Sequence, residues 1–181
     1  MPEATRLVTA DELEKFPDDD FRYELVEGRV VRMSPVGFRH GTTVIRLGAL
    51  LMRHAQERGL GAVMTEVGFK LASNPDTVRA PDVAFVRQDR IPTPEPRGFW
   101  NGPPDLAVEV LSPDDRTEDI RAKVAEYLTQ AVPTVVVVDP DSRKVTVLRP
   151  ATPELALATD DVLDLSDVVS GFRCTVRELF E

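Results

Sequence analysis

Residues 104–111 read Pro-Asp-Leu-Ala-Val-Glu-Val-Leu, a short apolar stretch that predicts a buried β-strand. Alternation along a strand places Asp105, Ala107 and Glu109 on one face, opposite aliphatic side chains on the other. A bare carboxylate in such an apolar strand costs free energy unless another group pairs with it or uses it. The partners of Glu109 therefore decide how the rest of the chain is interpreted.

A second acid with the same requirement is Asp82, which lies in the apolar stretch of residues 81–86. Asp105 cannot share an ion with Glu109, because the strand between them separates the two side chains by roughly 13 Å. A carboxylate from a neighbouring strand is needed, and Asp82 is the natural partner. Magnesium binds one or two carboxylates with waters and substrate phosphate, and it activates bound water. The two acids thus predict a metal-dependent phosphodiesterase, or else a plain ion pair of either acid with a lysine.

Two lysines compete for a place beside these acids. Residues 117–131 have the periodicity of a helix, and Tyr127 lies on its apolar stripe. Lys123 lies about 40° from Tyr127 on a helical wheel, so its stem can follow the apolar surface while the ammonium reaches inward. There it can orient water or stabilise developing negative charge. Lys70 is the rival, because a turn between its strand and the next would place it almost opposite Asp82 as a cross-strand ion pair.

The pattern of residues 23–33 predicts a β-hairpin that turns at Glu27-Gly28. Glu24 lies in its first strand, between Tyr23 and Leu25. Two interpretations of Glu24 remain open: an accessory acid that faces inward beside the metal, or an ordinary exposed strand residue.

A helix is predicted over residues 42–58, where apolar residues recur with helical spacing. Arg39, Arg46 and Arg53 recur every seven residues and form either a solvated face or a stripe that contacts phosphates. His40 precedes the predicted helix and is either a phosphate contact or a residue that starts the helix.

The net charge of −9 argues against broad nucleic-acid binding, but the charges are unevenly distributed. Residues 1–20 hold two basic and seven acidic residues, a balance of −5. Residues 21–58 hold seven arginines and three glutamates, a balance of +4. A local basic surface is therefore compatible with the acidic total.

Length and composition indicate one domain over residues 1–181 with a substantial core. No apolar run approaches the roughly 20 residues that span a bilayer. The N-terminus lacks the pattern of a secretory signal, so we expect a cytoplasmic protein without a membrane anchor. The single cysteine, Cys174, excludes an intrachain disulfide and a cysteine zinc cluster, and we expect it in the core.

Several short motifs combine along the chain in one order. They occupy residues 23–28, 33–35 with His40, 80–84, 104–113, 119–127, 137–140 and 171–172. The set resembles the PD-(D/E)XK nuclease superfamily. More closely, it resembles the bacterial Uma-type family, described as restriction endonucleases and long treated as a domain of unknown function. The resemblance covers nearly the whole chain.

The resemblance implies a restriction-endonuclease-like three-layer α/β fold, with a mixed central sheet flanked by helices and an N-terminal β-hairpin. It implies a Mg²⁺ or Mn²⁺ site and cleavage of DNA phosphodiester bonds. Asp82 and Glu109 would be the metal ligands, and Glu24 an accessory acid. The superfamily lysine normally lies two residues after the second acid, where this chain has Leu111. In the Uma-type family a lysine from the following helix is thought to replace it, which is Lys123 here.

Three functions are compatible with these features. The first is a metal-dependent endonuclease acting on DNA, in which Lys123 helps to activate water. The alternative is a catalytically inactive binding or scaffold protein with the nuclease fold, which Leu111 and the net charge favour. The third is a metal-dependent hydrolase of a nucleotide or another small phosphate. The apolar strands near residues 134–148 could pair across a two-fold axis, so we expect a homodimer.

Overall fold

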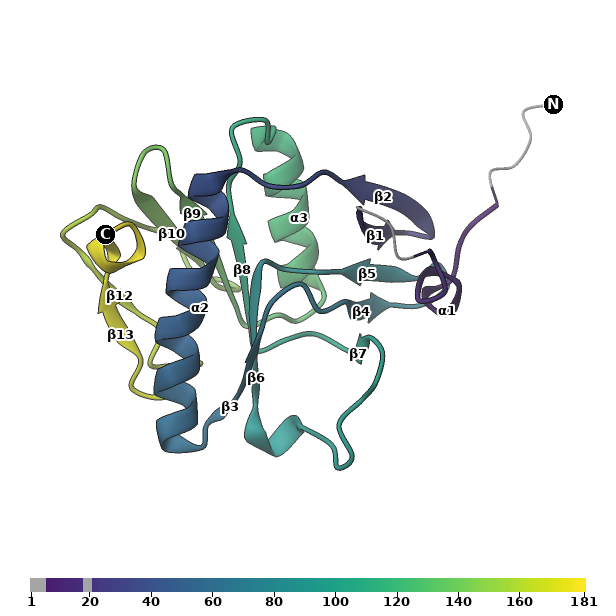
Figure 1. The fold of residues 1–181 in the computed structure, drawn as a ribbon, viewed down its shortest axis with the longest axis horizontal. Helices are drawn as coiled ribbons and strands as arrows, with labels where there is room; N and C mark the ends of the chain where they lie inside the picture. Colours follow the sequence, from purple (N-terminus) through teal and green to yellow (C-terminus); the bar gives the residue numbers. More distant parts are fainter. Residues whose placement is uncertain (1–5, 18–20) are drawn as a thin grey trace.

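A six-stranded mixed sheet forms the centre of the computed structural model, which describes residues 6–17 and 21–181 (Figure 1). Its strands, in order across the sheet, are β11 (Leu155–Leu157), β10 (Lys144–Leu148), β9 (Thr134–Asp139), β8 (Leu106–Val110), β6 (Val83–Arg87) and β3 (Gly61–Met64). Strands β8 and β9 run parallel, and the other neighbours are antiparallel. The run of valines in β9 is apolar on both faces and occupies an interior position, as the sequence predicts.

A helix covers each face of the central sheet. Helix α2 (Phe38–Arg58) shares one core cluster with Val108, and helix α3 (Thr117–Thr129) shares another with Ala107. Adjacent residues of β8 thus face opposite layers, as strand alternation requires. The predicted three-layer α/β fold with a mixed central sheet flanked by helices is confirmed.

A second sheet lies beside the first. Its order is β2 (Arg29–Met33), β1 (Arg22–Val26), β5 (Thr77–Arg79), β4 (Phe69–Ala72) and β7 (Trp100–Asn101). Strands β1 and β2 form the predicted N-terminal hairpin. Its turn has φ values of 48° at Glu27 and 75° at Gly28, the positive conformation that a two-residue hairpin turn requires.

Helix α2 begins at Phe38 rather than at Thr42, which corrects the sequence-based boundary. Gly37 is extended and caps the helix, and its carbonyl accepts a hydrogen bond from the Gly41 N–H. The helix therefore includes Gly41, although glycine has a low helix propensity. As a result, His40 lies inside the first turn instead of before it.

The strands near residues 134–148 do not form the free edge that motivated the expected homodimer. Strand β10 pairs with β11, with Val145 opposite Leu157. Strand β11 folds back and pairs along β10. The edge at this side of the sheet is the three-residue strand β11, and short edge strands pair poorly with other chains.

The remaining elements are short. They are α1 (Ala10–Leu13), η1 (Gln88–Arg90), η2 (Val176–Leu179) and the hairpin of β12 (Val162–Asp164) with β13 (Arg173–Thr175). Helix α1 carries a capping box between Thr9 and Glu12. None of the helices in the described residues has the length and apolar character needed to cross a membrane.

Candidate active site

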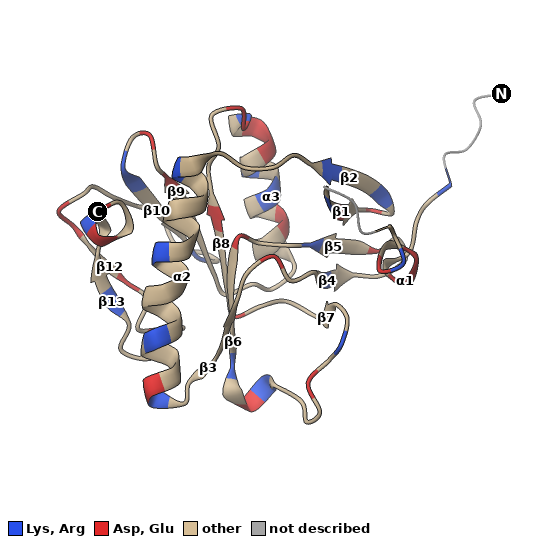
Figure 2. Cartoon of the chain, viewed as in Figure 1, with Lys and Arg blue, Asp and Glu red and all other residues tan. Residues whose placement is uncertain are grey.

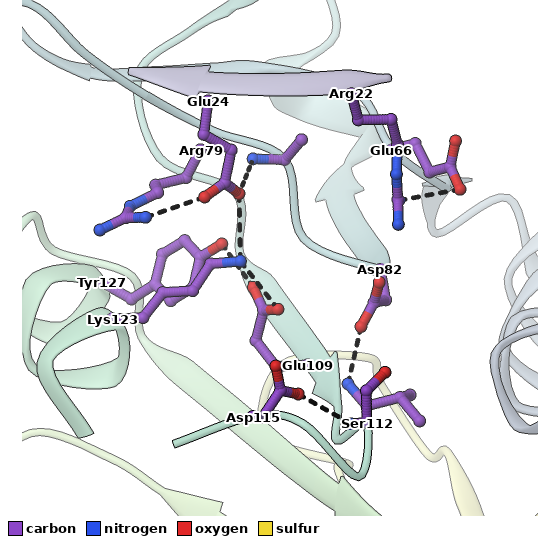
Figure 3. Close-up of polar contacts among 12 residues, drawn as sticks. Arg22, Glu24, Glu66, Arg79, Asp82, Glu109, Ser112, Asp115, Lys123 and Tyr127 are labelled. Carbon is purple, nitrogen blue, oxygen red and sulfur yellow. Dashed lines mark hydrogen bonds and ion pairs between the residues drawn. The ribbon is translucent and has the colours of Figure 1, made fainter. Parts of the chain in front are cut away.

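Asp82, just before β6, and Glu109, on the neighbouring strand β8, lie near each other at one end of the central sheet (Figure 3). Strands β6 and β8 pair with Val83 opposite Val108. Continuing this register by one residue places Asp82, just before β6, opposite Glu109. Both acids are buried, each with 6% of its surface exposed. Asp105 is also buried, but it lies at the other end of β8, where Arg90 holds its carboxylate at 2.8 Å.

The carboxylate of Asp82 is held by strand β8 and by helix α2. Its Oδ2 accepts a hydrogen bond from the Val110 N–H at 2.7 Å, and its Oδ1 lies 3.1 Å from His40 Nε2. The other ring nitrogen of His40 lies 3.1 Å from Ser112 Oγ. His40 is only 7% exposed, so its contacts go beyond those of a residue that starts a helix. These contacts with Val110 and His40 fix the orientation of the Asp82 carboxylate.

The carboxylate of Glu109 is bonded to two residues of helix α3. Lys123 Nζ donates to Oε2 at 2.9 Å, and the Tyr127 hydroxyl donates to Oε1 at 2.7 Å. These two residues are four apart on the helix, so they lie on one face. The helical phase of Lys123 read from the sequence agrees with this inward position.

Glu24 joins the same cluster from the second sheet. It is 3% exposed, and its Oε1 lies 3.0 Å from Lys123 Nζ and accepts the Ala80 N–H at 3.0 Å. Its Oε2 accepts from Arg79 Nη1 at 2.8 Å, and Arg79 also pairs with Glu126. Of the two open interpretations of Glu24, the exposed strand position is wrong.

Burial and neighbouring charges shift the protonation of the cluster. Burial raises the pKa of Glu109 to about 7, and the charge of Asp82 acts in the same direction, against the opposing charge of Lys123. Burial also disfavours the charged form of Lys123, but Glu109 and Glu24 outweigh it and raise the pKa of this ammonium. Burial acts against ionised Glu24 as well, yet Lys123 and Arg79 lower its pKa. Of the two glutamates, Glu109 is thus the one whose charged form is disfavoured.

These groups line a cleft of about 630 Å³ at the end of the central sheet. We call it the acidic cleft and define it by Glu24, Asp82, Glu109 and Lys123, with His40 and Ser112 on the same lining. Arg22 and Arg32 of the hairpin also line it. The cleft is therefore lined by buried carboxylates together with basic side chains.

The chemistry of the donor set fits a hard divalent cation that keeps several ligands of its own. Across residues 6–17 and 21–181, no group of three or more His, Cys, Asp or Glu side chains could enclose a metal ion. Asp82 and Glu109 supply two carboxylates, and each oxygen keeps a lone pair besides the hydrogen bond it accepts. Mg²⁺ typically takes one or two carboxylates and completes its shell with waters and substrate phosphate. A cation held by the two acids would also offset the repulsion from Asp82, which adds to the effect of burial in raising the pKa of Glu109.

Lys70 does not contact Asp82, so the expected cross-strand pair is wrong. Its ammonium lies 3.0 Å from Asp76 Oδ2, and strand β4 pairs with β5, with Lys70 opposite Val78. The turn after β4 leads into β5 of the second sheet, whereas Asp82 opens a strand of the central sheet. Lys70 thus makes an ordinary ion pair with a different acid.

Two residues of the cluster were missed as site residues in the sequence. Tyr127 was assigned only to the apolar stripe of its helix, yet a buried phenol needs a hydrogen-bond partner, and this is the signal that could have found it. Arg79 is charged and only 12% of its side chain is exposed. Its sole local signal is a cation in a short strand just before Pro81-Asp82.

Comparisons with known proteins identify a family and a fold. Residues 10–177 match the model of the Uma2 family, whose description is "putative restriction endonuclease". No curated protein matches the chain. A crystal structure described as a putative nuclease belonging to DUF820 from Anabaena variabilis is similar, with a TM-score of 0.83 and 21% identity, over 96% of this chain and 97% of that one. A DrdV–DNA complex has a TM-score of 0.40 and 17% identity, over 65% of this chain and 11% of that one, and carries no argument here.

Proposed function

Because this chain belongs to the Uma2 family, we propose that it is a metal-dependent endonuclease that hydrolyses DNA phosphodiester bonds. The observation that carries the proposal is the position of two buried acids on one cleft: Asp82, just before β6, and Glu109 of the neighbouring strand β8. Both acids are buried and line the acidic cleft, which has a volume of about 630 Å³. Such placement is costly for two carboxylates unless a cation uses them.

Asp82 and Glu109 would hold Mg²⁺ or Mn²⁺. The bound ion supplies Lewis-acid polarisation of a phosphate and a lowered pKa for a coordinated water. Lys123 places a fixed positive charge 2.9 Å from Glu109, where it can orient the water and stabilise negative charge that develops on phosphate oxygens. Glu24 keeps that ammonium in position from the other side, as an accessory acid.

The position of Lys123 supports its role as the replacement for the lysine absent at Leu111. The Leu111 N–H donates to the Val138 carbonyl at 2.8 Å, which continues the pairing of β8 with β9 past the end of the strands. Helix α3 follows this segment and returns across the sheet. Lys123, on the inward face of α3, therefore reaches Glu109 from the helix, whereas a lysine at position 111 would follow strand β8.

A second candidate function is a nuclease-fold protein that binds without cleaving. One observation favours it: the charged groups of the cluster already have partners within the cluster. Lys123 is shared by Glu109 and Glu24, and the remaining oxygen of Glu109 accepts from Tyr127. Charges satisfied in this way can persist as a purely structural network.

A cleavage assay separates the two functions. Purified protein would be incubated with supercoiled, linear and single-stranded DNA in Mg²⁺, Mn²⁺ or EDTA. We expect metal-dependent cleavage, reduced by about 100-fold or more in Asp82→Asn and Glu109→Gln. Glu118→Gln, an exposed acid on α3, is the matched control and should cleave like the wild type.

Metal binding gives the second readout. Calorimetry should show Mn²⁺ bound by the wild type and by Glu118→Gln, but not by Asp82→Asn. Equal cleavage by the wild type and Glu109→Gln would indicate a contaminating nuclease and overturn the assignment. Site-specific Mn²⁺ binding without cleavage of any DNA would instead favour the binding protein.

A further inference from the structure

A second hollow, of about 420 Å³, lies against helix α2 and the turn between β9 and β10. We call it the arginine cavity. Its lining includes Arg39, Thr43, Arg46, Asp141, Arg143 and Phe180. Figure 2 shows basic residues recurring along α2 and again near the β9–β10 turn, whereas the protein as a whole is acidic. The cavity thus concentrates positive charge that the total of −9 conceals.

The arginine cavity adjoins the acidic cleft along one edge of the central sheet. His40 lines the cleft, and the preceding residue Arg39 lines the cavity. Ser112, just after β8, lines the cleft, and Pro140, just after β9, lines the cavity. Because β8 and β9 are parallel neighbours, their carboxyl ends meet at the same edge, about 4.8 Å apart. The two hollows therefore lie side by side, one strand apart.

The three arginines of the cavity have only weak acidic partners or none among the described residues. Arg39 pairs with Asp141 at 2.8 Å and Arg143 with Glu181 at 3.0 Å. The arginine side chains in these pairs are 74% and 42% exposed, and such surface pairs are weak. Half-buried Arg46 has no hydrogen bond or ion pair with any residue that the structure describes. A cavity with one unmatched guanidinium and two weakly paired ones is suited to an anion.

We propose that Arg39, Arg46 and Arg143 bind a backbone phosphate of DNA next to the phosphodiester in the acidic cleft. This inference rests on the proposed endonuclease function. Guanidinium groups bind phosphate oxygens through several hydrogen bonds at once, and an incoming phosphate would displace the exposed carboxylates of Asp141 and Glu181. The cavity sets the path of the strand past the end of β9.

The position of the cavity favours a DNA strand over a free phosphate compound. A small phosphate needs an enclosing site with many donors, whereas the Arg39 side chain is largely open to solvent and that of Arg143 is partly open. Successive phosphates of one strand, by contrast, would occupy two adjoining hollows in turn. Inorganic phosphate shares the same recognition chemistry, so the experiment includes it as a separate arm.

The test measures DNA binding in EDTA, where metal-dependent cleavage is absent. Fluorescence anisotropy with a labelled duplex would compare the wild type with Arg46→Gln/Arg143→Gln over a range of salt concentrations. We expect the double variant to bind about 10-fold more weakly or worse. The slope of log K against log salt should fall by about 1 to 2, because each phosphate contact contributes nearly one unit. Thermal melting would verify that the variant is folded.

The matched control is Arg53→Gln/Arg58→Gln, which removes the same charge from exposed positions on α2 outside both hollows. We expect its affinity to stay within about 2-fold of the wild type. Equal losses in the two double variants would overturn the proposal, because general charge would then explain binding. Should the first double variant fail to fold, exposed Arg39→Gln replaces it, with an expected loss of about 3-fold and wild-type affinity as the contradicting result.

The inorganic phosphate arm uses calorimetry. Phosphate binding that is lost in Arg46→Gln/Arg143→Gln, with DNA affinity unchanged, would overturn the DNA assignment and indicate a small-molecule site. Cleavage is scored separately with Mn²⁺. Absence of cleavage together with arginine-dependent DNA binding in EDTA would contradict the proposed endonuclease function while leaving the phosphate site supported.

Discussion

Lys123 reaches from helix α3 to strand β8 and donates to the carboxylate of Glu109 at 2.9 Å. Only 12% of the lysine side chain and 7% of the glutamate side chain are exposed. Removing one member of a buried ion pair leaves the other charge uncompensated in a low-dielectric site. This contact therefore serves the fold and the proposed chemistry together.

The first prediction concerns that cation. Lys123→Met should lower the free energy of unfolding by about 3 to 5 kcal/mol, because two buried carboxylates lose their shared partner. Urea unfolding in EDTA measures the change. Lys144→Met, on an exposed position of β10, is the control and should change stability by less than about 0.5 kcal/mol. Equal stability of the two variants would show that the cluster does not depend on Lys123.

The second prediction concerns pH. The folded pKa of Glu109, about 7, lies above its ordinary value of 4.5, so the folded protein binds this proton more tightly than the unfolded chain. The contribution to stability is complete below pH 4.5 and is lost as the pH rises through 7. Relative to Glu109→Gln, the metal-free wild type should lose about 1 to 3 kcal/mol of unfolding free energy between pH 5 and 8. Parallel stability curves for the two proteins would contradict this.

The third prediction concerns His40, which holds Asp82 without being a metal ligand in the proposal. His40→Asn should weaken Mn²⁺ affinity by about 10- to 100-fold, because an outer residue orients the ligand that touches the ion. The other histidine of α2 provides the control. His54 bonds to the Ser170 carbonyl, outside the acidic cleft, and His54→Asn should bind Mn²⁺ normally in calorimetry.

The fourth prediction compares two glycines. A Cβ on Gly61, where φ is 151°, would lie 2.1 Å from the Val86 carbonyl oxygen. Gly61→Ala should therefore lower the free energy of unfolding by about 3 kcal/mol or more. Gly41 lies in helix α2 with no heavy atom within 4 Å of such a Cβ, and Gly41→Ala should raise stability by up to about 1 kcal/mol. Thermal melting of both variants distinguishes these opposite signs.

The fifth prediction concerns Cys174, which is 7% exposed in the main core cluster, as expected from the sequence. Burial, with a smaller contribution from Glu178, raises the pKa of its thiol from 9.0 to about 12. A disulfide reagent at pH 8 should react at least about 100-fold more slowly with the native protein than with the urea-unfolded chain. Stability should also fall as the pH rises above 9, because only the unfolded thiol ionises there. Rapid native-state labelling would contradict the buried position.

Local patterns predicted the parts of the fold that depend on neighbours in sequence. The period of two around Glu109 gave its face of the strand, and it excluded Asp105 as a partner for the same ion. Glu27-Gly28 gave the hairpin turn, and the phase of α3 gave the inward position of Lys123. Each of these depends on a repeat or turn that a few residues encode.

Contacts between the two sheets could not be obtained in this way. The assignment of Lys70 to Asp82 failed because β5 follows β4 in the chain and pairs with it in the second sheet, whereas Asp82 precedes β6 of the central sheet. Nothing in the sequence near either residue shows this. Arg79 reaches Glu24 through the same inter-strand packing. His40 was misplaced for a smaller reason: the helix starts at Phe38, three residues before Gly41, and this start depends on the cap made by extended Gly37.

Glu24 also gives the hairpin an influence over the central sheet. The ribbon of β1 and β2 docks on β5 with Leu25 opposite Val78, and it brings the Glu24 carboxylate to Lys123. If this ribbon moved away from β5, the Lys123 ammonium would keep Glu109 but lose Glu24 as an acidic partner. A fluctuation in one sheet thereby becomes a change in proton affinity in the other, and hydrogen exchange in β1 would report on the electrostatics of β8.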